Sequence, residues 1–180
     1  MALIDIGAEV KDRASVWNQG YTLIGKDNPA NASGTITSVE IWVNTTMYNF
    51  VVGTFYTTNG NTFKCRDSEE IPVAITPGSK QPFAVNLAVE TGDYIGLHFL
   101  LGRIERDIEG YAGLWHILGK YMDPGDEATY DFREGDALSL YGTGETPPGW
   151  SGKISGVTNP AKVMGVDKAN INKVKGVASA

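Results

Sequence analysis

Apolar and polar residues alternate with a period of two through most of the first 140 positions. The segment QPFAVNLAV (81–89) shows it best, because every second residue is apolar: Phe83, Val85, Leu87 and Val89. This period places the apolar side chains on one face of an extended strand. Four further segments follow the pattern in whole or in part and each predicts a strand: 38–44, 93–101, 110–118 and 136–142.

The pattern also predicts which side chains point inward. In 38–44 the inward face carries Val39, Ile41 and Val43, and Glu40 and Trp42 lie opposite. In 93–101 the inward residues are Ile95, Leu97 and Phe99, and in 136–142 they are Leu138 and Leu140. The segment 110–118 is apolar on both faces, which is typical of a central strand.

Turn signals separate these segments. Asn59-Gly60 lies between two β-rich runs and predicts a hairpin, and clusters rich in Gly, Pro, Asn and Asp mark the other breaks. No stretch of ten residues in the body shows the 3.6-residue period of an amphipathic helix. About nine or ten short strands predict an all-β fold, an antiparallel β-sandwich of the jelly-roll type.

The domain organisation follows from composition. The segment GTGETPPGWSG (142–152) combines glycine and proline with few core residues and marks the exit from the sandwich. We therefore expect a jelly-roll domain over residues 1–145 and a C-terminal extension over residues 146–180 that serves in assembly or anchoring. A domain of about 150 residues is large enough to bury its own core.

Charge divides along the same boundary. Residues 1–150 hold 10 Lys and Arg against 20 Asp and Glu, which gives −10. Residues 151–180 hold five Lys against Asp167, which gives +4 and the total of −6. An acidic body excludes a general nucleic-acid binder, since that affinity comes from phosphate neutralisation. The basic extension either contacts an anionic partner or uses its lysines to stay soluble.

The C-terminal extension repeats one short unit three times, as ISGV, VMGV and VKGV. A spacing of three fits neither a flat strand nor a long α-helix, so we expect a polyproline-like or turn-rich extended chain; a short helix over 163–177 stays open. The apolar residues require a covering surface, which makes them a predicted assembly interface. They are Ile154, Val157, Val163, Val166, Ile171, Val174 and Val177.

The search for catalytic residues gives little. The two histidines, His98 and His116, lie inside apolar strands and are expected to be structural. Glu105, Asp107 and Glu109 alternate in RIERDIEG (103–110), where two carboxylates suffice for glycoside hydrolysis. A solvated strand face is the preferred interpretation, because charged residues normally remain exposed. No catalytic residue and no enzyme activity is predicted.

Binding chemistry has two weaker signals. The acidic segment from Asp123 to Asp136 offers oxygen ligands for calcium, but it lacks EF-hand spacing and more simply predicts an acidic turn. Trp42 and Trp115 are candidate glycan contacts, since flat aromatic rings stack on sugars; burial in the core or an interface is the preferred alternative. No other cofactor is expected, and Cys65, the single cysteine, has no partner for an internal disulfide.

No run is apolar and long enough for a membrane span, and the N-terminal MALIDIGAEVKDR lacks the pattern of a signal peptide. A protein made and kept without secretion is therefore expected.

The segment ISGVTNPAKVMGVDKANINKVKGVA resembles C-terminal segments of bacteriophage structural proteins, including tail- and fibre-type proteins. In the body, KDNPANASGTITSVEIWVNT and VETGDYIGLHF resemble β-sandwich modules of phage and environmental viral genomes. The resemblance implies a virion component, usually oligomeric and assembled in the host cytoplasm with other virion proteins. It supplies no catalytic residues. Trimers are favoured by geometric analogy, because three period-three chains can bury one edge along a shared axis.

Three functions follow as hypotheses. The first is a non-enzymatic phage structural protein, a capsid decoration, fibre or tail component, whose C-terminal extension mediates oligomerisation or attachment. The second is a carbohydrate-binding module that recognises a host surface glycan. The third, ranked last, is a glycan-cleaving enzyme using Glu105 and Glu109.

Overall fold

A computed structural model describes residues 2–147 and four two-residue strands further along the chain. It divides the chain into two compact units, Leu3–Glu145 and Met1–Ala2 with Thr146–Ala180. The first unit, called the body below, is built from strands, and no helix occurs among the described residues. The predicted all-β class is confirmed.

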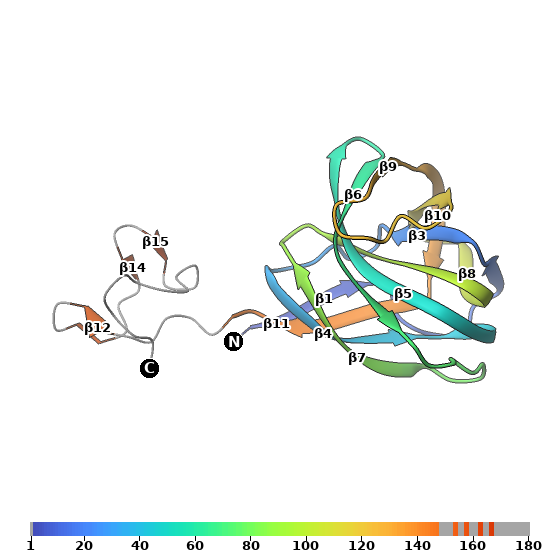
Figure 1. Ribbon diagram of the computed structural model, residues 1–180, viewed down its shortest axis with the longest axis horizontal. Coiled ribbons are helices and arrows are strands. Elements are labelled where there is room, and N and C mark those ends of the chain that lie inside the picture. The colour runs from blue at the N-terminus through green and yellow to red at the C-terminus, as the bar shows by residue number, and fades with distance from the viewer. Residues whose placement is uncertain (1, 148–152, 155–156, 159–161, 164–165, 168–180) are drawn as a thin grey trace. The chain divides into compact units, whose positions relative to one another are not determined.

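The body is an antiparallel sandwich of two sheets (Figure 1). The smaller sheet has the order β1-β11-β4-β7, with bounds Leu3–Gly7, Leu140–Glu145, Gly34–Ile41 and Gln81–Val89. The larger sheet has the order β10-β8-β5-β6-β9, with bounds Asp131–Leu138, Tyr94–Leu118, Val43–Asn59, Thr62–Ile71 and Glu127–Thr129. Two short strands, β2 (Ser15–Asn18) and β3 (Tyr21–Gly25), also pair with β8.

Eight of these strands have the connectivity of a jelly roll. The order β1-β11-β4-β7 faces the order β3-β8-β5-β6, and the chain passes repeatedly from one sheet to the other. Such double Greek-key connections place sequence-distant strands side by side. In Figure 1 the smaller sheet forms the lower layer of the body, and β6, β9 and β10 lie in the upper part of the body.

The space between the sheets holds the larger hydrophobic cluster, called the inter-sheet core below. Its members come from alternate positions of strands in both sheets, as the sequence predicts for Val39, Ile41 and Val43. Ile95, Leu97 and Phe99 of β8 are likewise buried in it, and so are Val85, Leu87 and Val89 of β7 with Phe83 packed alongside. The predicted inward faces are therefore confirmed.

Two predicted strands are wrong in their bounds because each contains a crossing between the sheets. The segment 38–44 is divided at Trp42, between β4 and β5, and the segment 136–142 is divided at Ser139, between β10 and β11. Backbone hydrogen bonds join both crossings to Glu105 of β8: Trp42 N donates to Ser139 O (3.2 Å), Ser139 N to Glu105 O (3.1 Å) and Glu105 N to Trp42 O (3.3 Å). The alternation of side chains continues through each crossing, so the local pattern does not reveal it.

The predicted strands 93–101 and 110–118 are parts of one long strand, β8. Its first half pairs with β5 and its second half with β10, and β3 pairs with both halves, since Leu23 lies opposite Leu97 and His116. Gly102 (φ 105°) and Gly113 (φ 119°) have backbone conformations that favour glycine, which lets β8 bend between its partners.

The larger sheet rolls back on itself. Its two ends in the sheet order, β9 and β10, are separated in the chain by Tyr130 alone. Inside this curl lies a second hydrophobic cluster, called the aromatic cluster below. Its buried members are Ile24, Val51, Phe55, Phe63, Cys65, Trp115, Met122 and Tyr130.

The predicted hairpin at Asn59-Gly60 is confirmed, one residue later than the sequence signal. Asn59 is the last residue of β5 and pairs with Thr62, the first residue of β6, so Gly60 and Asn61 form the loop. Gly60 has a φ of 58°, which glycine adopts without strain.

Candidate functional site

The C-terminal repeats form short antiparallel pairs where the structure describes them. Strands β12 (Lys153–Ile154) and β13 (Val157–Thr158) pair Ile154 with Val157. Strands β14 (Lys162–Val163) and β15 (Val166–Asp167) pair Val163 with Val166. The two apolar residues of each repeat, three positions apart in the sequence, are thus paired with each other. A polyproline-like helix has no internal hydrogen bonds, so the polyproline-like alternative does not describe these four paired strands.

The remaining predicted interface residues, Ile171, Val174 and Val177, lie outside the described residues, as does the proposed short helix over 163–177 beyond Asp167. The four described members share one register, with one apolar pair in each unit. The same short pairing thus recurs in two successive repeats.

Trp115, one of the two predicted glycan contacts, lies in the aromatic cluster with only 5% of its surface exposed. Its ring centroid is 4.5 Å from that of Phe63 and 5.4 Å from that of Phe132, and its Nε1 donates to Asn61 Oδ1 at 2.9 Å. The ring therefore has no free face on which a sugar can stack. Core burial, the alternative noted from the sequence, describes Trp115.

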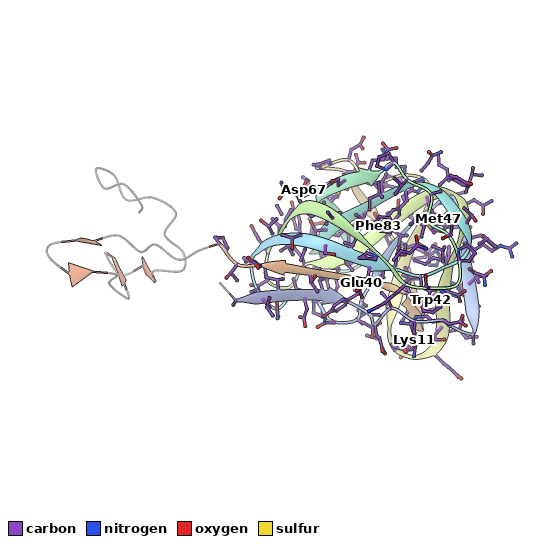
Figure 2. All side chains as sticks on the ribbon, turned by 90° about the horizontal axis from the view of Figure 1, so that it is seen from below. Lys11, Glu40, Trp42, Met47, Asp67 and Phe83 are labelled. Carbon is purple, nitrogen blue, oxygen red and sulfur yellow. The ribbon has the colours of Figure 1, made fainter. Side chains whose placement is uncertain are left out.

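Trp42, the other predicted glycan contact, is half-buried at the crossing between β4 and β5. Its neighbours Ile41 and Val43 are fully buried, so Trp42 keeps the outward orientation of Glu40. Figure 2, seen from the side of the smaller sheet, shows Glu40 and Trp42 in succession along the chain. An aromatic side chain thus lies beside the outer face of the smaller sheet.

A cleft of about 430 Å³ lies on this side of the body, between the ends of β1, β4 and β11. Tyr141 and Glu40, which are paired across β11 and β4, line it together with Lys80. Lys80 Nζ lies 2.9 Å from Glu40 Oε2, and the Tyr141 hydroxyl lies 3.4 Å from Asp5 Oδ2. Burial raises the pKa of Tyr141, with Asp5 acting in the same direction. The cleft therefore offers an aromatic ring flanked by hydrogen-bonding groups.

The expectation that Glu105 belongs to a solvated strand face is wrong. Glu105 is 2% exposed; its Oε2 accepts from Arg13 N (3.3 Å) and its Oε1 from Asn44 Nδ2 (3.0 Å). Its position at the meeting point of the two sheet crossings explains the burial. Glu109, the partner in the glycosidase hypothesis, is exposed. Nothing in this arrangement favours a catalytic pair.

Arg13 completes a buried polar cluster at this end of the sandwich. Its Nη1 donates to Asp107 Oδ2 (2.7 Å), its Nε to Ser139 Oγ (2.8 Å) and its Nη2 to Glu9 O (2.6 Å). The Arg13 contact lowers the pKa of Asp107 against the opposing effect of burial, which is the largest single influence. A buried guanidinium with every group paired fixes the geometry of its surroundings, so this cluster has a structural role.

The acidic segment from Asp123 to Asp136 forms a turn at its start. Asp123 N donates to Asp126 Oδ2 (3.0 Å), Asp126 N donates to Asp123 O (2.8 Å), and Lys120 Nζ lies 3.2 Å from Asp123 Oδ1. Among the described residues, no group of three or more His, Cys, Asp or Glu is arranged to hold a metal ion. The carboxylates of this turn serve the turn itself.

The two histidines lie on the larger sheet and differ in burial. His98 is buried, with Nδ1 3.1 Å from Tyr21 O, and burial lowers its pKa. His116 is half-buried with its ring centroid 4.9 Å from that of Trp17. No nucleophile is hydrogen-bonded to either ring within residues 2–147. The ring of His98 therefore lies in the interior of the body.

Sequence reasoning missed the residues that line the cleft beside Tyr141. Tyr141, Glu40 and Lys80 are widely separated in the chain, and none belongs to a motif. Their meeting depends on β11 pairing with β4, a long-range contact of the jelly roll. The only local signal was the outward position of Glu40 in the alternating pattern.

Comparison with known proteins adds no relationship to this picture. Over the described residues, no helix combines the length and apolar character that crossing a membrane requires. No protein-family model matches the chain, and no curated protein matches it significantly.

Proposed function

We propose that the protein is a non-enzymatic structural component of a phage particle, in which residues 146–180 join the body to sister chains or to other virion proteins. The observation that carries the proposal is the repeated pairing in the C-terminal unit, Ile154 with Val157 and Val163 with Val166. The resemblance of this segment to phage structural proteins, and of two body segments to phage β-sandwich modules, supports the virion context.

The physical argument starts from the size of the paired units. Each has only two residue pairs, and an isolated two-stranded hairpin is marginally stable in water. Such a unit gains stability when its apolar residues pack on a further surface. The C-terminal extension therefore provides a set of small docking elements. A sister chain is their simplest partner.

Charge supports the same assignment. Residues 151–180 carry +4 and residues 1–150 carry −10. Opposite net charges favour association between the extension of one copy and the body of another, and they raise the rate of encounter. Salt weakens this contribution at separations beyond about 8–10 Å.

Light scattering coupled to size exclusion tests the proposal directly. The full chain should elute as an oligomer, a trimer of 19.4 kDa chains being favoured, and a chain ending at residue 147 should elute as a folded monomer. The proposal fails if the truncated body keeps the oligomeric mass of the full chain, or if the full chain is itself a monomer across the accessible concentration range.

A matched pair of double variants locates the effect within the repeats. Val157→Ser with Val166→Ser removes one apolar residue from each described pair and should reduce the oligomeric mass. Thr158→Ser with Asp167→Ser changes the next residue in each unit and should leave the mass unchanged. Equal behaviour of the two double variants would contradict the role of the apolar positions.

The cleft beside Tyr141 favours a second candidate function, recognition of a glycan on the host surface. An aromatic ring and an ion pair line the cleft, and Trp42 follows its lining residue Glu40 by two positions in the chain; these are groups that orient and stack a sugar. A glycan array gives the test: Trp42→Ala and Tyr141→Ala should each abolish the strongest signals, while Tyr48→Ala, at an exposed site outside the cleft, should not. Absence of any signal from the parent protein would reject this function.

A further inference from the structure

A second cleft of about 210 Å³ opens where β2 and the start of β3 meet β8 and β10. Its lining combines two aromatic residues, Trp17 and Tyr21, with Asn18 and two arginines, Arg106 and Arg133. The arginines come from strands β8 and β10, which are adjacent in the larger sheet. None of the functions discussed above uses this cleft.

Trp17 holds the cleft in shape. It is 7% exposed, belongs to the inter-sheet core, and packs edge-on against Tyr21 (5.7 Å between centroids) and tilted against His116 (4.9 Å). Both guanidiniums lie over its ring: the Cζ of Arg106 is 4.8 Å and that of Arg133 is 5.4 Å from the centroid. Stacking on an aromatic face positions a guanidinium and leaves its in-plane N–H donors available.

The cleft retains uncompensated positive charge. Arg106 Nη1 lies 3.3 Å from Asp136 Oδ2, and its Nη2 donates to Ser15 Oγ at 3.4 Å, but its Nε is buried without a hydrogen-bond acceptor. Within residues 2–147, no carboxylate lies at ion-pair distance from Arg133. Two guanidiniums therefore face one buried carboxylate, and this occurs on a body that is otherwise acidic.

Burial disfavours the charged forms of both Asp136 and Arg106. Burial raises the pKa of Asp136, although Arg106 and Arg133 both act to lower it, and burial likewise lowers the pKa of Arg106. A buried donor without an acceptor costs free energy, which a bound ligand with acceptor oxygens removes. The arrangement is therefore incomplete as it stands.

We propose that this cleft binds the carboxylate of an acidic monosaccharide, such as a uronic acid at the end of a glycan. A single negative charge matches the net charge of the two arginines with Asp136, and a carboxylate matches the fork of a guanidinium. The cleft is too large for a carboxylate alone and smaller than a typical drug-sized pocket, which suits one sugar ring. Asn18 and Tyr21, which also line the cleft, carry side-chain groups able to hydrogen-bond ring hydroxyls.

The proposal does not depend on the assembly role of the C-terminal unit, because every residue that it uses lies in the body. It also differs from the cleft beside Tyr141, which holds an internally paired Glu40 and Lys80. The Trp17 indole signal, which belongs to the second cleft alone, therefore reports which of the two clefts is occupied.

The test is a titration of the full chain at constant ionic strength, followed by NMR of the tryptophan indole N–H groups. D-Glucuronate should bind saturably and shift the Trp17 signal, and D-glucose, which replaces the carboxylate by a hydroxymethyl group, should not. Acetate should bind at least tenfold more weakly than glucuronate. Equal binding of glucose would overturn the role of the carboxylate, and equal binding of acetate would overturn the assignment to a sugar.

Variants of the exposed Arg133 identify the site without disturbing the core. Arg133→Gln should weaken glucuronate binding by about tenfold, the effect of one charge-assisted hydrogen-bonding group, and Arg133→Lys should restore it only in part. Lys64→Gln, with the same change of charge on β6 outside the cleft, should bind like the parent protein. Unchanged binding by Arg133→Gln, or saturable binding without a shift of the Trp17 signal, overturns the proposal.

Discussion

The inter-sheet core and the aromatic cluster stabilise the same body in different ways. The inter-sheet core is mainly aliphatic and joins two sheets, and its residues recur at every second position of the strands. The aromatic cluster joins segments of one sheet, with Phe63 at its centre within 6 Å of the rings of Tyr94, Trp115 and Tyr130. The inter-sheet core depends on the local alternation of apolar residues. The aromatic cluster depends on how far β8 bends.

β8 is the strand that the two clusters share. Leu97 and Phe99 face the inter-sheet core, and Tyr94 and Trp115 face the aromatic cluster. A strand buried on both faces is expected in the centre of a fold, and its glycines provide the bends. We therefore expect the inter-sheet core to set global stability and the aromatic cluster to set the integrity of the curled end.

The largest effect should come from Phe99→Ala in the inter-sheet core. Phe99 is fully buried, so its truncation leaves a cavity between two sheets that cannot approach each other. The free energy of unfolding should fall by about 3–5 kcal/mol in urea denaturation. Amide exchange should accelerate in both sheets together. A change confined to β8 and β5 would contradict the global role of this core.

Phe63→Ala is the matched change in the aromatic cluster. The loss should lie at the lower end, about 3 kcal/mol, because the chain around Met122 and Tyr130 can move into the space. Hydrogen exchange should increase mainly in β6, β9 and β10 and leave the smaller sheet protected. Equal acceleration across both sheets would show that the two clusters open as one unit.

The stability of the body should depend on pH through His98 of β8. Burial holds the pKa of His98 below its ordinary value of 6.5, so the unfolded chain takes up a proton first as the pH falls. The contribution of neutral His98 is complete above pH 6.5 and is lost as the pH falls from 6.5 toward the folded-state pKa. The parent protein should therefore lose stability in thermal melts between pH 7.5 and 5.5.

His98→Gln should reduce this dependence on pH. His116, whose pKa is also lowered by burial, accounts for the remainder and is tested by His116→Gln. Carboxylates titrate mainly below this range, so they contribute little to the slope. A slope that both variants leave unchanged would contradict the assignment to these histidines.

The smallest expected effect is on a reaction rate, that of the Cys65 thiol. Burial raises the pKa of Cys65 to about 12, so the thiol of the native protein is neutral at pH 8 and reacts slowly with a thiol reagent. Cys65 lies in the aromatic cluster, and it is the single cysteine of the chain. Its reaction rate therefore reports the opening of that cluster.

Phe63→Ala should accelerate the reaction of Cys65 more than Phe99→Ala does, even though Phe99→Ala costs more stability. The order of the two rates would reverse if Cys65 became accessible only through global unfolding. This comparison needs no new substitution and separates the two clusters most sharply.

The sequence alone predicted the faces of the strands and the fold class. Alternation in 81–89 and 93–101 places the correct residues in the inter-sheet core, because period two is a property of any extended strand. The alternation did not predict the ends of the strands at Trp42 and Ser139, because the chain changes sheet there without interrupting the alternation. A crossing is defined by the partners of a strand, and partners are not local information.

The candidate sites show the same division. Trp115 has an apolar context in the sequence that fits either a core or a surface aromatic residue, and only the aromatic cluster decides for the core. Glu105 is charged, so exposure was the reasonable expectation, and the partners Arg13 and Asn44 reverse it. Neither partner is near Glu105 in the sequence.

The sequence by itself determined the all-β class, the inward faces, the opposite charges of the two parts and the repeats near the C-terminus, because these depend on local order and composition. The tertiary structure decided the rolling of the larger sheet, the burial of Glu105 and the meeting of Arg106, Arg133 and Trp17. Each of these requires strands that are distant in sequence to pair, and strand pairing is fixed by the packing of the whole body.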